Sequence, residues 1–189
     1  LPKDKGAKIL DFGCGYGHFL FLLEKEGYTD FIWIDVWKEN IEFCHKYITK
    51  RVSCVDDSIS FLQGQTNTFD FIILNDVLEH IPKSETINLL GSLHKALKKW
   101  WILVLKMPNH SNPYTIRERY CDFTHEVWFN EQSLEQVLRI AWFVGTKYYW
   151  FTFSKYSWKW IIGEFVRGIL LWITRIHMYL MGITNYRVI

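Results

Sequence analysis

The sequence predicts an α/β domain, doubly wound around a mostly parallel sheet with helices on both faces. Short apolar runs typical of strands alternate along the chain with segments of helical periodicity, as in βαβ units. The stretch "FDFIILN" at residues 69–75 is a continuous apolar run, as expected for a parallel strand buried on both faces. Glycines at positions 13, 15 and 17 separate the first apolar run from the first helical segment, where such folds place a tight turn.

The first half of the chain supplies three of the expected strands and two of the helices. Residues 8–12 form the first apolar run, and residues 17–26 follow it with apolar side chains at helical spacing. Residues 31–35 are a second strand, which is rich in aromatic and β-branched residues, and a helix over about 39–48 comes next. Residues 51–55 then predict a short third strand.

The second half continues the alternation after the fourth strand at residues 69–75. Residues 84–98 predict an amphipathic helix, and residues 101–106 predict a fifth strand. The polar and aromatic segment 109–128 is longer than a passive connection usually is, so it is a candidate functional loop. A helix over 130–140, capped by Asn130, follows it, and residues 143–153 predict a further strand.

Size, charge and cysteine spacing limit the class of protein. The 189 residues are enough for one domain with a full hydrophobic core, and a net charge of +2 gives no reason to expect a nucleic-acid partner. The four cysteines form no CxxC pair and no metal-type cluster, so we expect free thiols in the cytoplasm and no metal site. The first residues, Leu-Pro-Lys-Asp-Lys-Gly, do not predict a signal peptide, and no uncharged stretch is long enough for us to expect a membrane span.

Residues 151–189 differ from the domain that we expect over residues 1–150. Apolar residues recur at helical spacing from Trp158 to Met181, and basic residues outnumber the single acid, Glu164. We interpret this segment as a strand and basic amphipathic helical extension of the same domain. Such a helix packs on its own domain or on a second subunit, or it attaches peripherally to an anionic membrane surface.

The glycine turn indicates what kind of ligand the domain binds. A glycine-rich turn that opens a helix offers backbone N–H groups and the positive end of the helix dipole to a ligand. The spacing here is GxGxG, and His18 stands where the third glycine of a dinucleotide fingerprint would be. Asp11 precedes the glycines, and its carboxylate would repel a pyrophosphate. It suits a cationic ligand instead, and S-adenosylmethionine carries both a sulfonium and an ammonium group.

The stretch "ILDFGCGYG" resembles the first motif of class I S-adenosylmethionine-dependent methyltransferases, which have a Rossmann-like fold. The resemblance covers residues 6–150. It implies that Asp11, Gly13, Gly15 and Gly17 surround the cofactor, and that Asp35 in "IWIDV" binds the ribose hydroxyls.

Two further stretches extend the resemblance along the chain. In "VDDSISFL", the acid that contacts adenine in the family matches Asp57 best, with the Ser58 backbone beside it, and Asp56 competes with Asp57 for this role. In "FDFIILNDVLEHIP", the Asn75 region corresponds to the part of the site that lines the methionine end of the cofactor.

The segment "RYCDFTHEVWFNEQSLEQVLRIAWF" resembles a subgroup associated with sugar or cell-surface glycan modification. We therefore expect methyl transfer to an oxygen or nitrogen of a small-molecule or glycan-type acceptor. The general base would be His125, which Glu126 would orient, or His80, and His110 is a third candidate. Two alternatives stay open: a module that binds the cofactor without transferring a methyl group, and an NAD-linked oxidoreductase.

Tryptophan stands at several positions where this resemblance expects glycine. The positions are Trp33, Trp100, Trp101, Trp128 and Trp142. Glycine in such turns often supplies a positive φ or a close backbone approach, and tryptophan suits neither. Either the gene uses UGA for glycine and was translated with tryptophan, or the protein has repacked its turns around aromatic residues. The codons at these positions decide between the two.

Overall fold

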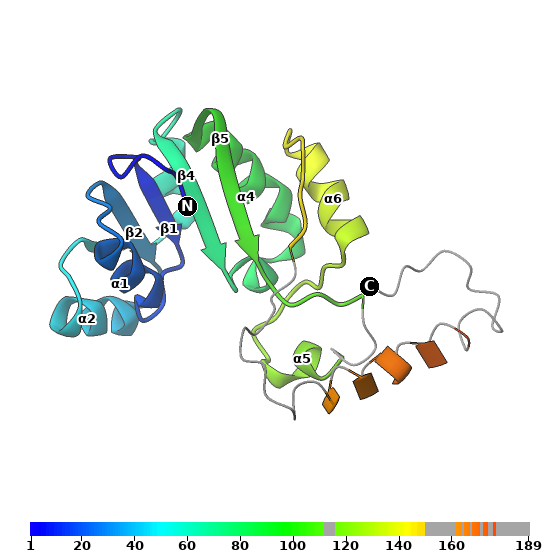
Figure 1. The fold of residues 1–189 in the computed structure, drawn as a ribbon. Coiled ribbons are helices and arrows are strands. Elements are labelled where there is room, and N and C mark those ends of the chain that lie inside the picture. The colour runs from blue at the N-terminus through cyan, green and yellow to red at the C-terminus, as the bar shows by residue number, and fades with distance from the viewer. Residues whose placement is uncertain are drawn as a thin grey trace.

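The chain folds around a single five-stranded sheet with strand order β3-β2-β1-β4-β5 (Figure 1). The computed structural model describes residues 1–111, 116–149 and scattered positions between 162 and 176. Every strand pairing in this part of the chain is parallel. The order reverses direction between β1 and β4, so the carboxyl ends of these two strands form the crevice where α/β folds place a ligand.

Most of the expected elements form, with shifts at their ends. The first half contains β1 (Ile9–Phe12), α1 (His18–Lys25), β2 (Phe31–Asp35), α2 (Lys38–Tyr47), β3 (Val52–Cys54) and α3 (Ser58–Gln63). The second half contains β4 (Phe69–Asn75), the 3-10 helix η1 (Leu78–His80), α4 (Lys83–Ala96), β5 (Leu97–Lys106), α5 (Ile116–Cys121) and α6 (Glu131–Ile140). Helices α3 and α5 were not predicted, because each is only six residues long and too short to show a period.

The expected strand at 143–153 is wrong where the structure describes it. Residues 143–149 form no strand, and the remaining positions of that segment lie outside the described residues. Tyr148 instead packs back toward α6, where its hydroxyl group lies 3.1 Å from the Glu131 carbonyl oxygen and 3.0 Å from Glu135 Oε2. The side chain therefore folds over the helix instead of entering the sheet.

Two apolar layers cover the two faces of the sheet. Helices α1 and α2 pack on one face, and α3, α4 and α6 pack on the other (Figure 1). Neighbouring residues of one strand serve opposite layers: Ile9 belongs to the α1 and α2 side, and Leu10 belongs to the α4 side. This alternation is the period-2 rule for strands, and it confirms the doubly wound architecture.

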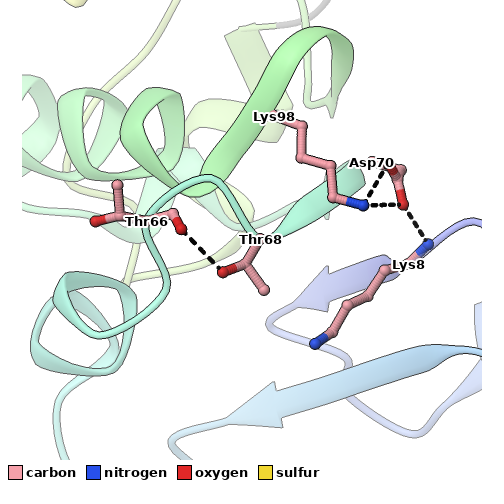
Figure 2. A network of polar contacts seen from close by, with 5 residues as sticks. All are labelled: Lys8, Thr66, Thr68, Asp70 and Lys98. Atoms are coloured by element: carbon pink, nitrogen blue, oxygen red, sulfur yellow. Dashed lines mark hydrogen bonds and ion pairs between the residues drawn. The ribbon is translucent and has the colours of Figure 1, made fainter.

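An ion pair between a buried carboxylate and a half-buried lysine lies at the amino end of the sheet, opposite the ligand edge. Asp70 of β4 accepts a hydrogen bond from the Lys8 N–H, which precedes β1, at 2.8 Å. The Lys98 ammonium group of β5 lies 2.8 and 2.9 Å from the two carboxylate oxygens of Asp70 (Figure 2). Burial disfavours the charged carboxylate, but these contacts outweigh that effect and lower the pKa of Asp70.

Helix α6 is capped by side chains at its start and by backbone hydrogen bonds at its end. Its start carries the predicted cap, since Asn130 Oδ1 accepts from the Ser133 N–H at 2.9 Å and Ser133 Oγ accepts in return from the Asn130 N–H at 3.0 Å. At its end, the Trp142 N–H bonds to the Arg139 carbonyl and the Phe143 N–H bonds to the Leu138 carbonyl, which is a Schellman motif. This motif places Trp142 at φ +69°, in the left-handed region that favours glycine.

The C-terminal positions that the structure describes are helical, and their side chains are exposed. Large apolar side chains are among them: Ile162, Phe165, Val166, Ile169, Leu170, Trp172, Ile173 and Ile176. Within the described residues, no helix combines the length and the apolar character that crossing a membrane requires.

Candidate functional site

The glycine turn between β1 and α1 needs residues without side chains. Gly13, Gly15 and Gly17 all have positive φ, at +77°, +51° and +76°. A Cβ atom added to Gly13 would lie 2.6 Å from Cγ2 of Val77, so the turn also packs closely against the segment after β4. Gly17 then precedes α1 without a side-chain cap, which leaves the helix N-terminus available to a ligand.

Asp11 is a buried carboxylate at the end of β1. It is 1% exposed, and neither of its oxygens has a hydrogen-bond partner among the described residues. Burial, with a smaller contribution from the charge of Asp35, raises the pKa of Asp11 to about 7. An unpaired buried acid costs stability, so its presence here indicates a site prepared for a partner that the chain itself does not supply.

A cavity of about 550 Å³ opens above Asp11 at the carboxyl edge of the sheet. It is lined by Asp11, Gly13, Cys14, Gly15, Tyr16, His18, Phe19, Asn75, Asp76 and Lys106. The lining comes from the ends of β1, β4 and β5 and from the first turn of α1. The structure therefore brings Asp11, Gly13, Gly15 and Asn75 together around one cavity. Of the other expected cofactor residues, the lining of this cavity does not include Gly17, Asp35, Asp57 or Ser58.

Six residues of this cavity were missed as site residues by the sequence analysis: Cys14, Tyr16, His18, Phe19, Asp76 and Lys106. Asp76 directly follows β4, Lys106 is the last residue of β5, and their side chains form an ion pair beside Asn75. The Asp76 N–H also donates to the Lys106 carbonyl oxygen at 2.8 Å. Tyr16 lines the cavity from inside the glycine turn. For Asp76 the available signal was its position directly after a buried strand, whereas the pairing of β4 with β5 was needed to place Lys106.

Asp35 lies at the end of β2, one strand away from Asp11. Its carboxylate accepts hydrogen bonds from the Gly15 N–H at 2.8 Å, the Trp37 N–H at 2.8 Å and the Asn40 amide at 3.3 Å. The Asp35 side chain is 5% exposed, and its hydrogen bond with the Gly15 N–H anchors the glycine turn to the end of β2. A carboxylate has about four lone-pair positions, which leaves about one for a ligand hydroxyl.

The acids after β3 differ in what they already contact. The Asp57 carboxylate caps α3, because it accepts from the Ile59 N–H at 2.9 Å and from the Ser60 hydroxyl group at 2.5 Å. These bonds lower the pKa of Asp57, although the side chain is exposed. Asp56 is exposed and has no side-chain partner within the described residues. Ser58 begins α3 and is half-buried.

His80 and His125 lie face to edge with their ring centroids 4.7 Å apart. The backbone holds them there: the Glu126 and Val127 N–H groups donate to the Glu79 carbonyl oxygen at 2.8 and 3.1 Å. His80 Nδ1 lies 2.9 Å from the Thr124 hydroxyl oxygen. The long loop and the segment after β4 therefore form one cluster, as expected if both histidines serve the same site.

The carboxylate beside His125 is not the one that the sequence suggested. The Glu126 side chain is exposed and forms no hydrogen bond with His125 in the part of the chain described. Glu79, at 3% exposed, is buried in the same cluster, and burial raises its pKa. The two carboxylate oxygens of Glu79 and the Nδ1 atom of His125 have no hydrogen-bond partner among the described residues. His110 joins this region through its N–H, which donates to the Phe129 carbonyl oxygen at 3.0 Å.

Two of the tryptophans at glycine-expected positions leave buried indole N–H groups unpaired. Trp33 is fully buried in β2, and Trp33 and Trp128 each have an Nε1 atom without a partner in the described structure. An added Cβ on Gly17 would lie 3.5 Å from the Trp33 ring, so this ring packs beneath the glycine turn and does not line the cavity. Nothing is described of the Trp100 and Trp101 side chains.

The site fits the cofactor that the resemblance implies. A buried carboxylate without a partner, at the floor of a cavity and below a glycine turn, suits a ligand with a positive charge close to an adenosine. The thiol groups of Cys14 and Cys44 do not compete for this ligand as anions, because burial raises the pKa of both.

Comparison with known proteins agrees with this geometry. A family profile described as "Methyltransferase domain" matches residues 1–144. A ubiquinone biosynthesis O-methyltransferase of Methylocella silvestris is 33% identical over 91 residues, which are 43% of this chain and 35% of that protein. The chain therefore spans about a third of the length of this curated relative.

Two solved structures share the fold. The crystal structure of a SAM-dependent methyltransferase from Archaeoglobus fulgidus superposes with a TM-score of 0.65 and 26% identity, over 72% of this chain and 60% of that one. Phosphoethanolamine N-methyltransferase 2 of Haemonchus contortus, in complex with S-adenosyl-L-methionine, superposes with a TM-score of 0.60 and 21% identity, over 74% and 34% of the two chains. The prediction of a class I methyltransferase fold is confirmed, and the chain belongs to the methyltransferase domain family.

Proposed function

We propose that this domain binds S-adenosylmethionine at the carboxyl edge of the sheet and transfers its methyl group to an oxygen or nitrogen atom of an acceptor. The observation that carries the proposal is the buried Asp11 carboxylate, which has no partner among the described residues and faces a cavity of about 550 Å³ below the glycine turn. A cationic ligand restores the charged form of this acid, and an NAD pyrophosphate would be repelled by it.

We assign the methionine end of the cofactor to residues that line the cavity, and the ribose and adenine to residues outside its lining. Asp11 and Asn75 would hold the methionine end, and the N-terminus of α1 would face the ligand with its free N–H groups. Asp35 has about one lone-pair position left for a ribose hydroxyl. Since Asp57 already caps α3, Asp56 is the freer acid for the adenine, beside the Ser58 backbone.

Methyl transfer from a sulfonium needs alignment more than activation. The cofactor supplies an activated methyl group, and positioning of the acceptor in line with the methyl–sulfur bond can contribute about 7–11 kcal/mol. In our proposal the cluster of His80 and His125 faces the acceptor, because His80 lies in η1, which follows the cavity residues Asn75 and Asp76 along the chain.

The hydrogen bonds of this cluster define which histidine nitrogen accepts a proton. The Thr124 hydroxyl donates to Asp122 Oδ1 at 2.7 Å, since an ionised carboxylate only accepts. Thr124 Oγ1 must therefore accept from His80 Nδ1–H, which leaves the lone pair of His80 on Nε2. His125 carries its unpartnered Nδ1 beside Glu79. Both histidines are then candidates for the general base.

The acceptor class rests on the relatives. The ubiquinone relative methylates oxygen by its name, and the Haemonchus structure is named as an N-methyltransferase of a small molecule. We propose a small-molecule acceptor, with a glycan-type acceptor as the second class that a substrate panel should contain.

A binding measurement and a transfer assay test the proposal separately. S-adenosylmethionine and S-adenosylhomocysteine should raise the melting temperature of the full chain, and NAD should not. The absence of a shift with both adenosyl ligands would contradict the assignment. Transfer of labelled methyl groups to a cell extract then separates an enzyme from a module that only binds. His125→Ala should lower turnover by about 10²–10⁴-fold while cofactor affinity hardly changes.

We also propose that residues 151–189 are an extension of the domain at 1–150 that associates with a second copy of this chain. The apolar side chains exposed at the described positions between 162 and 176 support this. Sedimentation of the chain with and without residues 151–189 tests it. A monomer in both cases, with binding of the full chain to anionic vesicles, would favour the membrane interpretation instead.

A further inference from the structure

Three side chains with metal-ligating atoms meet where the segment after β4 contacts the loop before α6. One carboxylate oxygen of Glu79 and one ring nitrogen each of His80 and His125 all lie within 4.8 Å of one another. Glu79 and His80 belong to η1 after β4, whereas His125 comes from the loop before α6. The backbone bonds from residues 126 and 127 to the Glu79 carbonyl hold the two segments together.

The cluster lacks the internal partners that a structural role would provide. Glu79 is 3% exposed, yet neither of its carboxylate oxygens accepts a hydrogen bond within the described residues. His125 Nδ1 is also buried without a partner there. Buried polar groups in native proteins are almost always satisfied, so three unsatisfied atoms at one place point to a missing partner.

The third member of the cluster is already oriented as a ligand. The chain of bonds from His80 Nδ1 through the Thr124 hydroxyl to Asp122 fixes the ring and its tautomer. Such an outer partner on the second ring nitrogen is the usual companion of a metal-bound histidine. It leaves His80 Nε2 as a neutral donor atom with a free lone pair.

We propose that Glu79, His80 and His125 bind a divalent transition-metal ion, with Zn²⁺ as the ion that this donor set fits best. Two imidazole nitrogens and one carboxylate are a recurrent zinc ligand set, and three protein ligands leave at least one position open. Tetrahedral Zn²⁺ would bring its ligand atoms to about 3.3 Å from one another, given metal–ligand distances of about 2.0–2.1 Å. The ion would draw the three side chains together from separations of up to 4.8 Å.

The open position would serve the acceptor. A bound ion is a Lewis acid, so an acceptor hydroxyl that binds there becomes more acidic and is held next to the cavity. This role rests on the proposed methyl transfer, but binding of the ion does not, because the ligand set is independent of the cofactor residues. If the acceptor hydroxyl reacts at the metal ion, His80 and His125 act as metal ligands, and neither of them is the general base.

Cobalt titration of the full chain tests the site without any activity measurement. Co²⁺ should bind with one ion per chain and give visible d–d absorption, and Zn²⁺ should displace it. Glu79→Gln keeps the size of the side chain and removes only the charged ligand. We expect Glu79→Gln and His125→Ala each to weaken Co²⁺ binding more than the about 10- to 100-fold that loss of an outer-shell partner costs.

Matched controls distinguish this site from metal binding elsewhere on the chain. His45→Ala removes a histidine whose Nε2 lies 3.0 Å from the Val52 carbonyl, between α2 and β3, and it should leave the titration unchanged. Binding by the free cysteines would instead show a thiolate charge-transfer band in the near ultraviolet. The melting temperature of Glu79→Gln without metal should equal or exceed that of the natural chain, which shows that the variant folds.

Two results would overturn the proposal. One is the absence of stoichiometric Co²⁺ or Zn²⁺ binding by the full chain, which would leave a buried water as the partner of these groups. The other is a titration that Glu79→Gln and His125→Ala leave unchanged. Either result leaves the cofactor assignment standing, because S-adenosylmethionine binding is measured on its own.

Discussion

Replacing Trp142 with glycine should stabilise the protein. Trp142 follows the last turn of α6 at φ +69°, where the Schellman motif requires a left-handed residue. A non-glycine residue held there costs about 1–3 kcal/mol. Glycine offsets about 0.5–1 kcal/mol of this gain, because a glycine residue loses more backbone freedom on folding than other residues do. The indole is 78% exposed, so its removal forfeits little packing.

The net expectation for Trp142→Gly is a gain of about 1 kcal/mol in the free energy of unfolding. For a chain of this size such a gain raises the melting temperature by about 2–4 °C. Calorimetry together with urea unfolding followed by far-ultraviolet circular dichroism would measure it, since neither method relies on the indole fluorescence that the substitution alters.

A series at the same position isolates the backbone effect. Trp142→Ala also removes the exposed indole but keeps a Cβ atom at positive φ, so it should not gain stability. Trp142→Asn should fall between the two, because asparagine tolerates the left-handed region better than most residues. Equal melting temperatures for alanine and glycine would refute the reasoning, since the gain would then come from removing the aromatic surface.

Three further perturbations test other parts of the structure. Asp11→Asn should raise the melting temperature of the unliganded protein more at pH 8 than at pH 5, and it should abolish the shift that S-adenosylmethionine induces. The pKa of Asp11 is about 7 in the folded protein against 3.8 in the unfolded chain, so the protein with the natural acid loses stability as pH rises through this window. A difference in melting temperature that does not depend on pH would contradict this. Gly13→Ala should destabilise by about 1–3 kcal/mol, measured by urea unfolding, because of φ +77° and the contact with Val77, and Val77→Ala should recover part of the loss. Asp70→Asn should lower the free energy of unfolding by about 1–3 kcal/mol at pH 7. The deficit should disappear in acid, because the pKa of the natural carboxylate is lowered and its contribution to stability is lost as pH falls through that value. An equal deficit at pH 3 would count against the ion pair.

Four of the five strands could be predicted from the sequence to within one residue at each end, whereas β5 begins at Leu97, four residues before its expected start. The bounds of β2 and β4 match the expected ranges, since a fully buried parallel strand shows itself as an unbroken apolar run. Helix α6 was predicted together with its cap, because a capping residue leaves a local signal at Asn130. The short helices α3 and α5 leave no such signal, and the strand expected over 143–149 was a false positive of aromatic composition.

Part of the grouping of residues around the cavity could be predicted for the same reason. Asp11 and the glycines lie within one turn of the chain, so their spacing alone places them together, and Asn75 follows from the rule that parallel strands end at one edge. The identity of Asp57 as the cap of α3 could not be predicted, because the choice between adjacent acids depends on where a helix of one and a half turns begins.

The sequence by itself determined the fold class and the glycine turn, since each depends on residues that are neighbours along the chain, and it led to the expectation of a cationic ligand. Only the tertiary structure decided which carboxylate lies beside His125. Thr124 lies 44 positions after His80, and no periodicity relates two segments so far apart. The Glu79 carbonyl oxygen brings the two segments together, because it accepts hydrogen bonds from the N–H groups of residues 126 and 127. This contact makes Glu79, in η1 after β4, part of a three-residue cluster with His80 and His125.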